Sequence, residues 1–285
     1  MSAPSHVPPA PAVLRLVQEL VFGRWRSSGE ELYREVAELV AVGAGQEVLV
    51  AGCGDGTSAE WLAARTGAAV SGVDPDADRV DAADERARER AERGAPLPLA
   101  FQQAPLDDLP HETNVFDAAV GEPVLAAAAD PERAVAELVR VTKPMGTIVL
   151  LQLTWSSELS AEARRLLIER LGMRPRMLVE WKQMLREAGV VDLQVHDWTD
   201  EGETPGEVAE QAQLTWQQKV QIVGRAFRRW GWREAREALE REEGLLRELT
   251  REQRALGFQL IRGVKWPHAR AEGRSDDGPA QRRVG

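Results

Sequence analysis

One glycine-rich segment constrains the fold of this chain more than any other feature. Residues 48–56 read Val-Leu-Val-Ala-Gly-Cys-Gly-Asp-Gly, so a short apolar run passes directly into alternating glycines. The apolar run predicts a buried strand, and residues 57–65 predict a helix. Glycines let the backbone approach a ligand closely, and the first N–H groups of a helix favour acceptor-rich or anionic groups. The segment predicts a strand, a ligand-binding turn and a helix, and a plain connecting turn is its alternative.

Strands and helices continue to alternate along the chain. Strands are predicted at residues 47–51, 69–73, 99–102, 116–120 and 147–153, with helices at 57–65, 77–93 and 131–140. Asp130 and Pro131 suit the N-cap and first position of the last of these helices. This alternation predicts an α/β fold with a parallel sheet covered by helices on both faces. Such sheets bind ligands beyond the carboxyl ends of their strands.

Helical patterns flank this core on both sides. Apolar stripes precede it (Leu14, Val17, Leu20, Val21 and then Leu32, Val36, Leu39, Val40). After it we expect a helix at 178–188, a strand at 190–195, a helical insertion at about 201–254 and a last strand at 256–264. Residues 13–266 are predicted to form one domain, between a Pro-rich start (1–12) and a polar tail (270–285) that are predicted to be disordered.

Asp74 ends the strand that follows the glycine turn. An acid at this place in a nucleotide-binding sheet can accept both hydroxyls of a ribose. The alternative is that Asp74 only caps the turn before the next helix. Together with the glycine turn, Asp74 favours a ligand that contains ribose.

Residues 47–153 resemble the class I methyltransferases that use S-adenosylmethionine (SAM), especially the small-molecule group of ubiquinone and menaquinone biosynthesis. Four segments match in order: 48–56, 72–74, 116–120 and 136–146. The resemblance implies a Rossmann-like sheet, mostly parallel with an antiparallel last strand. It also implies that the N-terminal helices and the late helical insertion cover the substrate site.

The resemblance assigns cofactor contacts to the glycine loop, namely Gly52, Cys53, Gly54, Asp55 and Gly56. It places the glycines at the methionine part of SAM. A NAD enzyme would carry Gly-x-Gly-x-x-Gly instead of the Gly-x-Gly-x-Gly found here. The spacing therefore favours SAM as the cofactor.

Further residues receive roles from the same resemblance. Asp74 would hold the ribose, with Pro75 and Leu106 as further cofactor contacts, Pro75 beside the adenine. Gly121 and Glu122, after the fourth strand, would lie near the transferable methyl. Glu122 is the catalytic candidate, because it can orient an amine or hydroxyl acceptor, and a surface or capping glutamate is the alternative.

Trp155 follows the fifth strand, where this fold builds its substrate mouth, and is the candidate substrate contact. The chain has nine tryptophans, and core packing is the alternative for most of them. Methyl transfer depends mainly on alignment, and a general base is needed only where the acceptor loses a proton. His111 and His196 are the other candidate bases, but with Glu122 they form no evident dyad.

Three positions depart from the family pattern. Val50 stands where an acid is usual, Pro105 where an aspartate reads the adenine, and Met145 where a glycine opens the turn before the fifth strand. Asp107 and Asp108 lie close enough to Pro105 in sequence to substitute for that aspartate.

The composition excludes several other classes of protein. The net charge of −10 argues against a broad nucleic-acid-binding face, which needs clustered Lys and Arg. A single cysteine permits no internal disulfide framework and fits a cytoplasmic protein. No metal-ligand spacing occurs. No apolar run approaches the roughly 18 residues of a membrane span, and the N-terminus does not resemble a signal peptide.

The sequence therefore predicts SAM-dependent methyl transfer to a small-molecule acceptor, with S-adenosylhomocysteine (SAH) as product and no metal. A catalytically silent relative that acts as a partner or scaffold subunit is the alternative, motivated by Val50 and Pro105. A protein or RNA methyltransferase is a second rival. The one basic cluster (Arg225, Arg228, Arg229, Arg233) more simply forms a solvated helix face. The sequence leaves a homo-oligomeric state open.

Overall fold

The fold is built on one mixed sheet. The computed structural model describes residues 29–155, 173–198 and 256–267, with single residues between 161 and 168 and between 232 and 240. Eight strands form a sheet with the order β3-β2-β1-β4-β5-β8-β7, and β6 pairs with β5 off this path. The strands are β1 (Glu47–Ala51), β2 (Ala69–Asp74), β3 (Leu99–Gln103), β4 (Phe116–Gly121), β5 (Thr142–Trp155), β6 (Arg176–Met177), β7 (Val190–Asp197) and β8 (Leu256–Lys265).

The expected strand directions are confirmed. Strands β1 to β6 pair in parallel wherever they meet, whereas β8 runs antiparallel to both β5 and β7. The chain builds β1, β2 and β3 outward to one edge and then returns to place β4 beside β1. This reversal is a topological switch point, where the carboxyl ends of neighbouring strands leave a crevice for a ligand.

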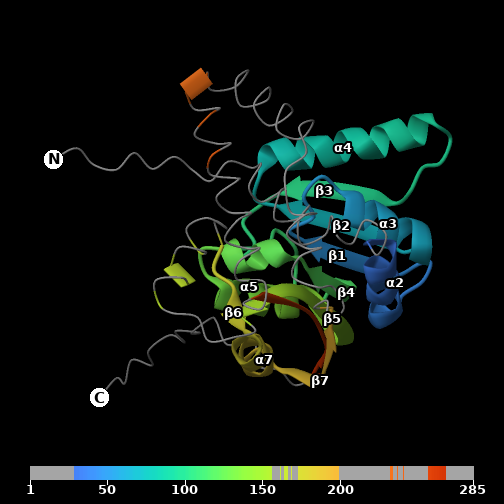
Figure 1. Cartoon of the computed structure of the whole chain (residues 1–285). Helices are drawn as coiled ribbons and strands as arrows, with labels where there is room; N and C mark the ends of the chain where they lie inside the picture. Colours follow the sequence, from blue (N-terminus) through green and yellow to red (C-terminus); the bar gives the residue numbers. More distant parts are fainter. Residues whose placement is uncertain are drawn as a thin grey trace, which may run out of the picture.

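Helices cover the sheet as the apolar patterns predict. They are α2 (Gly29–Val40), α3 (Thr57–Thr66), α4 (Ala77–Glu92), the 3₁₀ turn η1 (Pro123–Ala127), α5 (Pro131–Val141) and α7 (Leu178–Glu187). Figure 1 shows α2 and α3 together on one side of the strands and α5 and α7 together on the other. The Asp130 side chain accepts from the N–H of Arg133 at 3.0 Å, which confirms the expected N-cap of α5.

The core lies between the sheet and these helices. Val48, Leu49 and Val50 of β1 are almost fully buried in succession, as in a parallel strand that is covered on both faces. The α2 stripe inserts Leu32, Val36 and Val40 into the same core. The switch point at the end of β1 therefore rests on rigid packing.

Strand β5 begins earlier than expected. Phe116 faces Thr142 and Ala118 faces Thr147, so residues 143–146 bulge out of the ladder. The sequence pattern suggested a turn there, because Pro and Gly interrupt the apolar run. The second stripe and the last strand lie as predicted. The first stripe, both predicted disordered ends and nearly all of the helical insertion lie outside the described residues.

Met145 occupies a left-handed conformation in this bulge, with a φ of 66° and 62% exposure. A non-glycine residue there costs about 1–2 kcal/mol, and a glycine loses about 0.5–1 kcal/mol more backbone entropy on folding. We expect Met145→Gly to stabilise the protein by about 0.5–1 kcal/mol in urea unfolding, the net of these terms. Met145→Ala keeps the strain and is the control. Equal stability of the two variants would contradict this reasoning.

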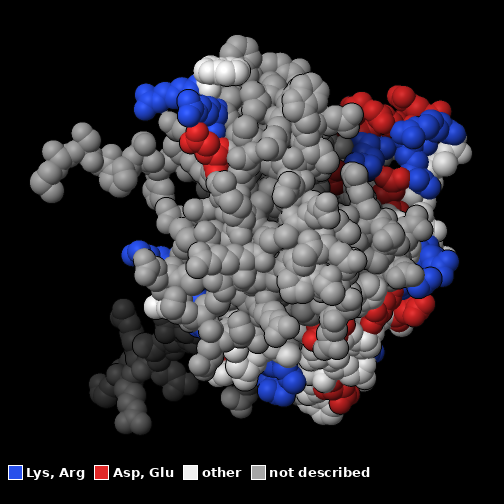
Figure 2. All heavy atoms as spheres, in the orientation of Figure 1, with Lys and Arg blue, Asp and Glu red and all other residues white. Residues whose placement is uncertain are grey.

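The described surface around α4 carries charges of both signs. Figure 2 shows basic and acidic side chains mixed at the upper right, where Figure 1 has α4. Ion pairs in this region join Arg88 to Glu85 and Arg93 to Glu89. Within the ranges that the structure describes, no helix has the length and apolar character to span a membrane.

Candidate cofactor site

The glycine loop leaves β1 in the conformation that its sequence predicts. Gly52, Gly54 and Gly56 have φ angles of 85°, 56° and 78°, which glycine adopts far more readily than other residues. The Gly52 N–H donates to the Val73 carbonyl at 2.6 Å, which ties the loop to β2. A side chain at Gly56 would lie 2.8 Å from the Phe101 ring. Close packing therefore requires glycine here as well.

Asp74 closes the loop from the next strand. Its two carboxylate oxygens accept the N–H groups of Gly54 at 2.9 Å and Asp76 at 3.0 Å. The side chain is buried, and burial is the main reason that its pKa is raised. Each carboxylate oxygen can accept a second hydrogen bond, so Asp74 can still bind two hydroxyls. The structure therefore joins both predicted elements of a ribose site.

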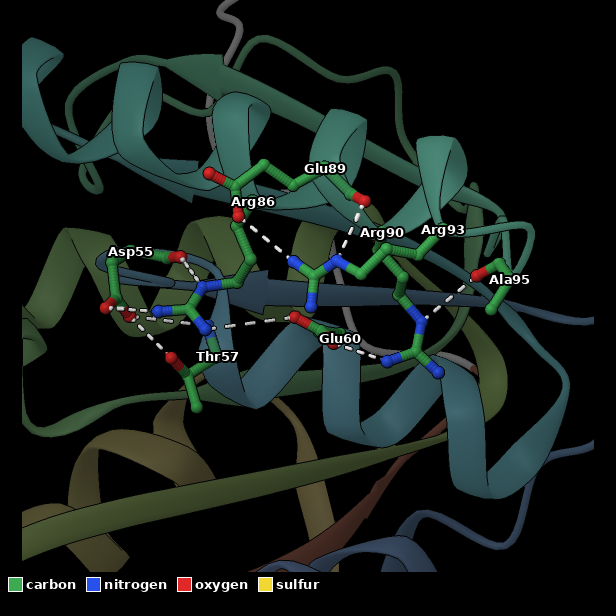
Figure 3. A network of polar contacts seen from close by, with 8 residues as sticks. All are labelled: Asp55, Thr57, Glu60, Arg86, Glu89, Arg90, Arg93 and Ala95. Carbon is green, nitrogen blue, oxygen red and sulfur yellow. Dashed lines mark hydrogen bonds and ion pairs between the residues drawn. The ribbon is translucent and has the colours of Figure 1, made fainter.

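The Asp55 side chain points toward Arg86 of α4 and Thr57 of α3 (Figure 3). Its carboxylate accepts from the Thr57 hydroxyl at 2.8 Å and from Arg86 of α4 at 2.9 Å, and Arg86 Nε also donates to the Asp55 carbonyl at 3.0 Å. Burial raises the pKa of Asp55, but the hydrogen bonds and the Arg86 charge outweigh it and lower the pKa overall. Glu60 lies beside the same arginine and bonds Arg90. Asp55 thus fixes the loop to α4, and a cofactor contact would come from its backbone.

Glu122 lies directly after β4, which flanks β1 on the side opposite to β2 and Asp74. Its N–H donates to the Ala51 carbonyl at 2.9 Å, and its Cβ lies 3.3 Å from where a Gly52 side chain would begin. The carboxylate accepts from the Tyr33 hydroxyl of α2 at 3.0 Å and also bonds Ser58. It is 5% exposed. Burial, together with the Asp74 charge, raises the pKa of Glu122 to about 7. The Tyr33 and Ser58 hydroxyls act in the opposite direction and lower the pKa, but burial outweighs them.

Tyr33, Ser58 and Gln152 belong to this site but were not predicted from the sequence. Gln152 of β5 is fully buried and donates to the Glu122 carbonyl at 3.0 Å. Its Oε1 has no hydrogen-bond partner among the described residues. Tyr33 is the only tyrosine of the chain, and this rarity was the one available hint. The contacts join residues far apart in the sequence, so no local pattern reveals them.

The other candidates lie at or after the carboxyl ends of β2, β3 and β4. Pro75 follows Asp74 and accepts from Gln103 at the end of β3. Leu106 is buried, whereas Pro105 is exposed. Gly121 is needed for packing, because a side chain there would overlap Leu125 of η1. These positions are compatible with the predicted roles of Pro75, Leu106 and Gly121 and do not test them.

Trp155 ends β5 and is 6% exposed. The guanidinium carbon of Arg164 lies 5.6 Å from its ring centroid, within the range of a cation–π contact. The substrate role of Trp155 stays a prediction. Trp232 is exposed, and Trp216 and Trp230 lie outside the described residues.

The two histidines lie away from Glu122. The His111 ring packs edge-on against Phe116, the first residue of β4, and therefore lies at the opposite end of that strand. His196 Nδ1 lies 2.6 Å from Oε1 of Glu35 in α2. Neither joins Glu122 in a dyad.

The adenine role suggested for Asp107 and Asp108 stays a prediction. Asp108 is exposed and pairs with Arg133 of α5 at 3.6 Å. Val50 is fully buried in β1, so a polar contact to the cofactor is absent at that position. In the described part of the chain, no group of three or more His, Cys, Asp or Glu residues could hold a metal ion.

Comparison with known proteins identifies the central segment. Residues 49–150 match the family described as "Methyltransferase domain". This segment runs from β1 into β5 and contains the glycine loop, Asp74 and Glu122. The match includes every strand that lines the switch point.

Two curated relatives share this region. "Methyltransferase GfsG" of Streptomyces halstedii is 30% identical over 123 residues, which are 43% of this chain and 43% of that protein. "O-methyltransferase cnsE" of Penicillium expansum is 30% identical over 128 residues, 44% of each chain. The similarity thus spans less than half of either relative.

Solved structures match the fold of this chain. The [4+2]-cyclase SpnF matches with a TM-score of 0.67 and 20% identity, covering 90% of this chain and 94% of its own. Geranyl diphosphate C-methyltransferase from Streptomyces coelicolor A3(2), solved with Mg²⁺, geranyl diphosphate and SAH, matches with a TM-score of 0.63 and 18% identity, covering 93% and 86%. The fold is that of the class I methyltransferases.

Proposed function

We propose that this protein transfers a methyl group from SAM to a small-molecule acceptor and releases SAH. The observation that carries the proposal is the Asp74 carboxylate, buried at the end of β2 and tied to Gly54 of the loop at 2.9 Å. This is where a nucleotide-binding sheet holds a ribose. The methyltransferase-domain match over residues 49–150 supports the same reading.

The residues present fit SAM in most respects. Asp74 offers free acceptor capacity to a ribose, and Pro75 and Leu106 offer apolar contact to an adenine. Gly56 is the N-cap of α3 and makes no side-chain cap hydrogen bond, so N–H groups of the first turn can donate to a carboxylate. When bound, SAM supplies an activated methyl on a sulfonium. The protein's contribution is alignment and exclusion of water.

On the acceptor side, the proposal gives roles to Glu122, Gly121 and Trp155. Glu122 would orient the hydroxyl or amine of the acceptor and could take its proton, since its pKa of about 7 suits a general base. Gly121 allows η1 to pack closely against β4. Trp155 would contribute an apolar wall to the acceptor site.

The finer assignments concern the acceptor atom, the substrate class and the location. The name of the Penicillium relative, an O-methyltransferase, supports an oxygen acceptor. The resemblance to ubiquinone and menaquinone enzymes supports an aromatic or quinol-like acceptor. The net charge of −10 supports a small molecule rather than a nucleic acid as substrate. The single buried cysteine supports a reducing, cytoplasmic location.

A calorimetric titration with SAM and SAH tests the proposal. We expect both ligands to bind, and Asp74→Ala to weaken binding by at least about tenfold, or about 1.4 kcal/mol, because the ribose loses its acceptor. Asp81→Ala, an exposed acid on α4, is the matched control and should bind as the wild type does. Absence of heat and of thermal shift with both ligands, in folded protein free of carried-over ligand, would reject the proposal.

A different activity on the same fold is the alternative. SpnF is named a cyclase although its fold matches this one, and Val50 removes an acid that methyltransferases usually carry. A protein that binds neither ligand and forms a stable complex with another chain would fit the silent partner or scaffold role.

A further inference from the structure

Glu122 has an unusual set of neighbours for a buried acid. It is 5% exposed, its carboxylate accepts from the neutral Tyr33 hydroxyl at 3.0 Å, and the neutral Ser58 hydroxyl also favours its charged form. Within the described part of the chain, no lysine or arginine forms an ion pair with it. The titratable groups that face it are Tyr33 of α2, Cys53 of the loop and Asp74 of β2. No basic side chain of the described residues therefore pairs with a negative charge on Glu122.

The position of Glu122 predicts where a positive charge would come from. In the proposed binding mode Asp74 holds the ribose, and the family resemblance implies that the adenine lies beside Pro75. The same resemblance implies that the methionine part of SAM lies at the glycine loop and the transferable methyl near Glu122. Glu122 lies next to Gly52 of this loop. The sulfonium of SAM lies in this part of the cofactor, whereas SAH carries a neutral thioether there.

We propose that Glu122 distinguishes SAM from SAH by charge, with Tyr33 as a positioning residue. At neutral pH part of the free protein carries a proton on this carboxyl, and that proton is lost to solvent when the sulfonium binds. The inference rests on the proposed function and extends it to the acceptor. Burial of an unpaired charge is costly, but a buried pair of opposite charges is tolerated.

The same carboxylate can then accept the proton that is released during methyl transfer. The acceptor oxygen or nitrogen forms a bond to the methyl carbon, and the carbon–sulfur bond breaks with its electron pair left on sulfur. Glu122 takes the proton that the acceptor loses. Sulfonium and carboxylate become thioether and carboxylic acid, so this pair has no net charge before or after the step. The acceptor class is therefore a neutral molecule with an O–H or N–H group.

Proton release measured by calorimetry tests this inference. SAM and SAH are titrated into the protein in phosphate and in Tris at the same pH, because the difference in heat between buffers counts the protons released. With a pKa of about 7 for Glu122, we expect about half a proton per SAM at pH 7 and nearly one at pH 6. SAH is expected to release almost none.

Two variants test whether the released proton comes from Glu122 and whether Tyr33 affects its release. Glu122→Gln should bind SAM without this release and prefer SAM over SAH less than the wild type does. Both ligands share the amino group, so the difference between wild type and Glu122→Gln isolates Glu122. Tyr33→Phe removes a hydrogen bond that stabilises the carboxylate, so its release at pH 7 should rise toward one proton.

Asp117→Asn is the matched control, since Asp117 lies at the start of the same strand and pairs with Lys143. It should release as many protons as the wild type. SAM binding with equal proton release in wild type and Glu122→Gln would overturn the inference. An unchanged release in Tyr33→Phe would overturn the role of Tyr33. Failure of both ligands to bind would instead reject the proposed function.

Discussion

Gly52→Ala is expected to destabilise the protein by about 3 kcal/mol and to abolish SAM binding. Two effects add. The φ of 85° at Gly52 is left-handed, which costs an alanine about 1–2 kcal/mol. The new methyl would also overlap Val124 Cγ1 of η1 and lie 3.3 Å from Glu122 Cβ, and such overpacking costs about 1–3 kcal/mol.

The binding loss follows from the same geometry. Gly52 and Cys53 both donate to the Val73 carbonyl, at 2.6 and 3.1 Å. A shift of Gly52 that relieves the overlap would break this link between the loop and β2. Gly54, which bonds Asp74, would move with it. Urea unfolding and calorimetric titration with SAM measure the two consequences on the same sample.

Gly45→Ala introduces the same backbone strain as Gly52→Ala but no steric overlap. Gly45 has a φ of 84°, almost the same as that of Gly52, but an added side chain there meets nothing within 4 Å. We expect it to lose only about 1–2 kcal/mol and to bind SAM normally. Equal stability losses at the two positions would show that Val124 yields, and the packing argument would then be wrong.

The central strands could be predicted because their signals are local. Strand β1 begins and ends as the apolar run and the first glycine indicate, and Asp130 caps α5 as its position before Pro131 suggests. Strand β5 was placed too late. Its first residues pair with Phe116 around a bulge, and that pairing depends on a partner strand rather than on the residues themselves.

The site was only half predictable for a similar reason. The loop and Asp74 are separated by one helix, so topology alone brings them together. Asp55 belongs to the same loop, yet its direction is decided by Arg86 of α4. Tyr33 and Gln152 reach Glu122 from α2 and β5. Contacts of this kind depend on how layers pack, which hydrophobic periodicity does not encode.

Glu122→Gln is expected to stabilise the ligand-free protein by about 3 kcal/mol at pH 8 and by much less at pH 5. The pKa of Glu122 is raised from 4.5 to about 7, so the folded state holds the proton more tightly than the unfolded state. This contribution to stability is complete below about pH 4.5 and is lost as the pH rises through 7. A shift of about 2.5 units at about 1.4 kcal/mol each gives the stated magnitude.

Asp117→Asn is the control, and its effect on stability is expected to have the opposite sign. Burial raises the pKa of Asp117, but the Glu47 N–H and Lys143 outweigh it and lower the pKa overall, so this substitution should destabilise the protein at pH 8. Unfolding in urea at pH 5 and pH 8 measures both variants. If Glu122→Gln destabilised the protein equally at the two pH values, Glu122 would act through packing or hydrogen bonds alone. If Glu122→Gln stabilised the protein only at high pH, the negative charge of Glu122 would be shown to destabilise the free protein. A bound cation could then offset that cost.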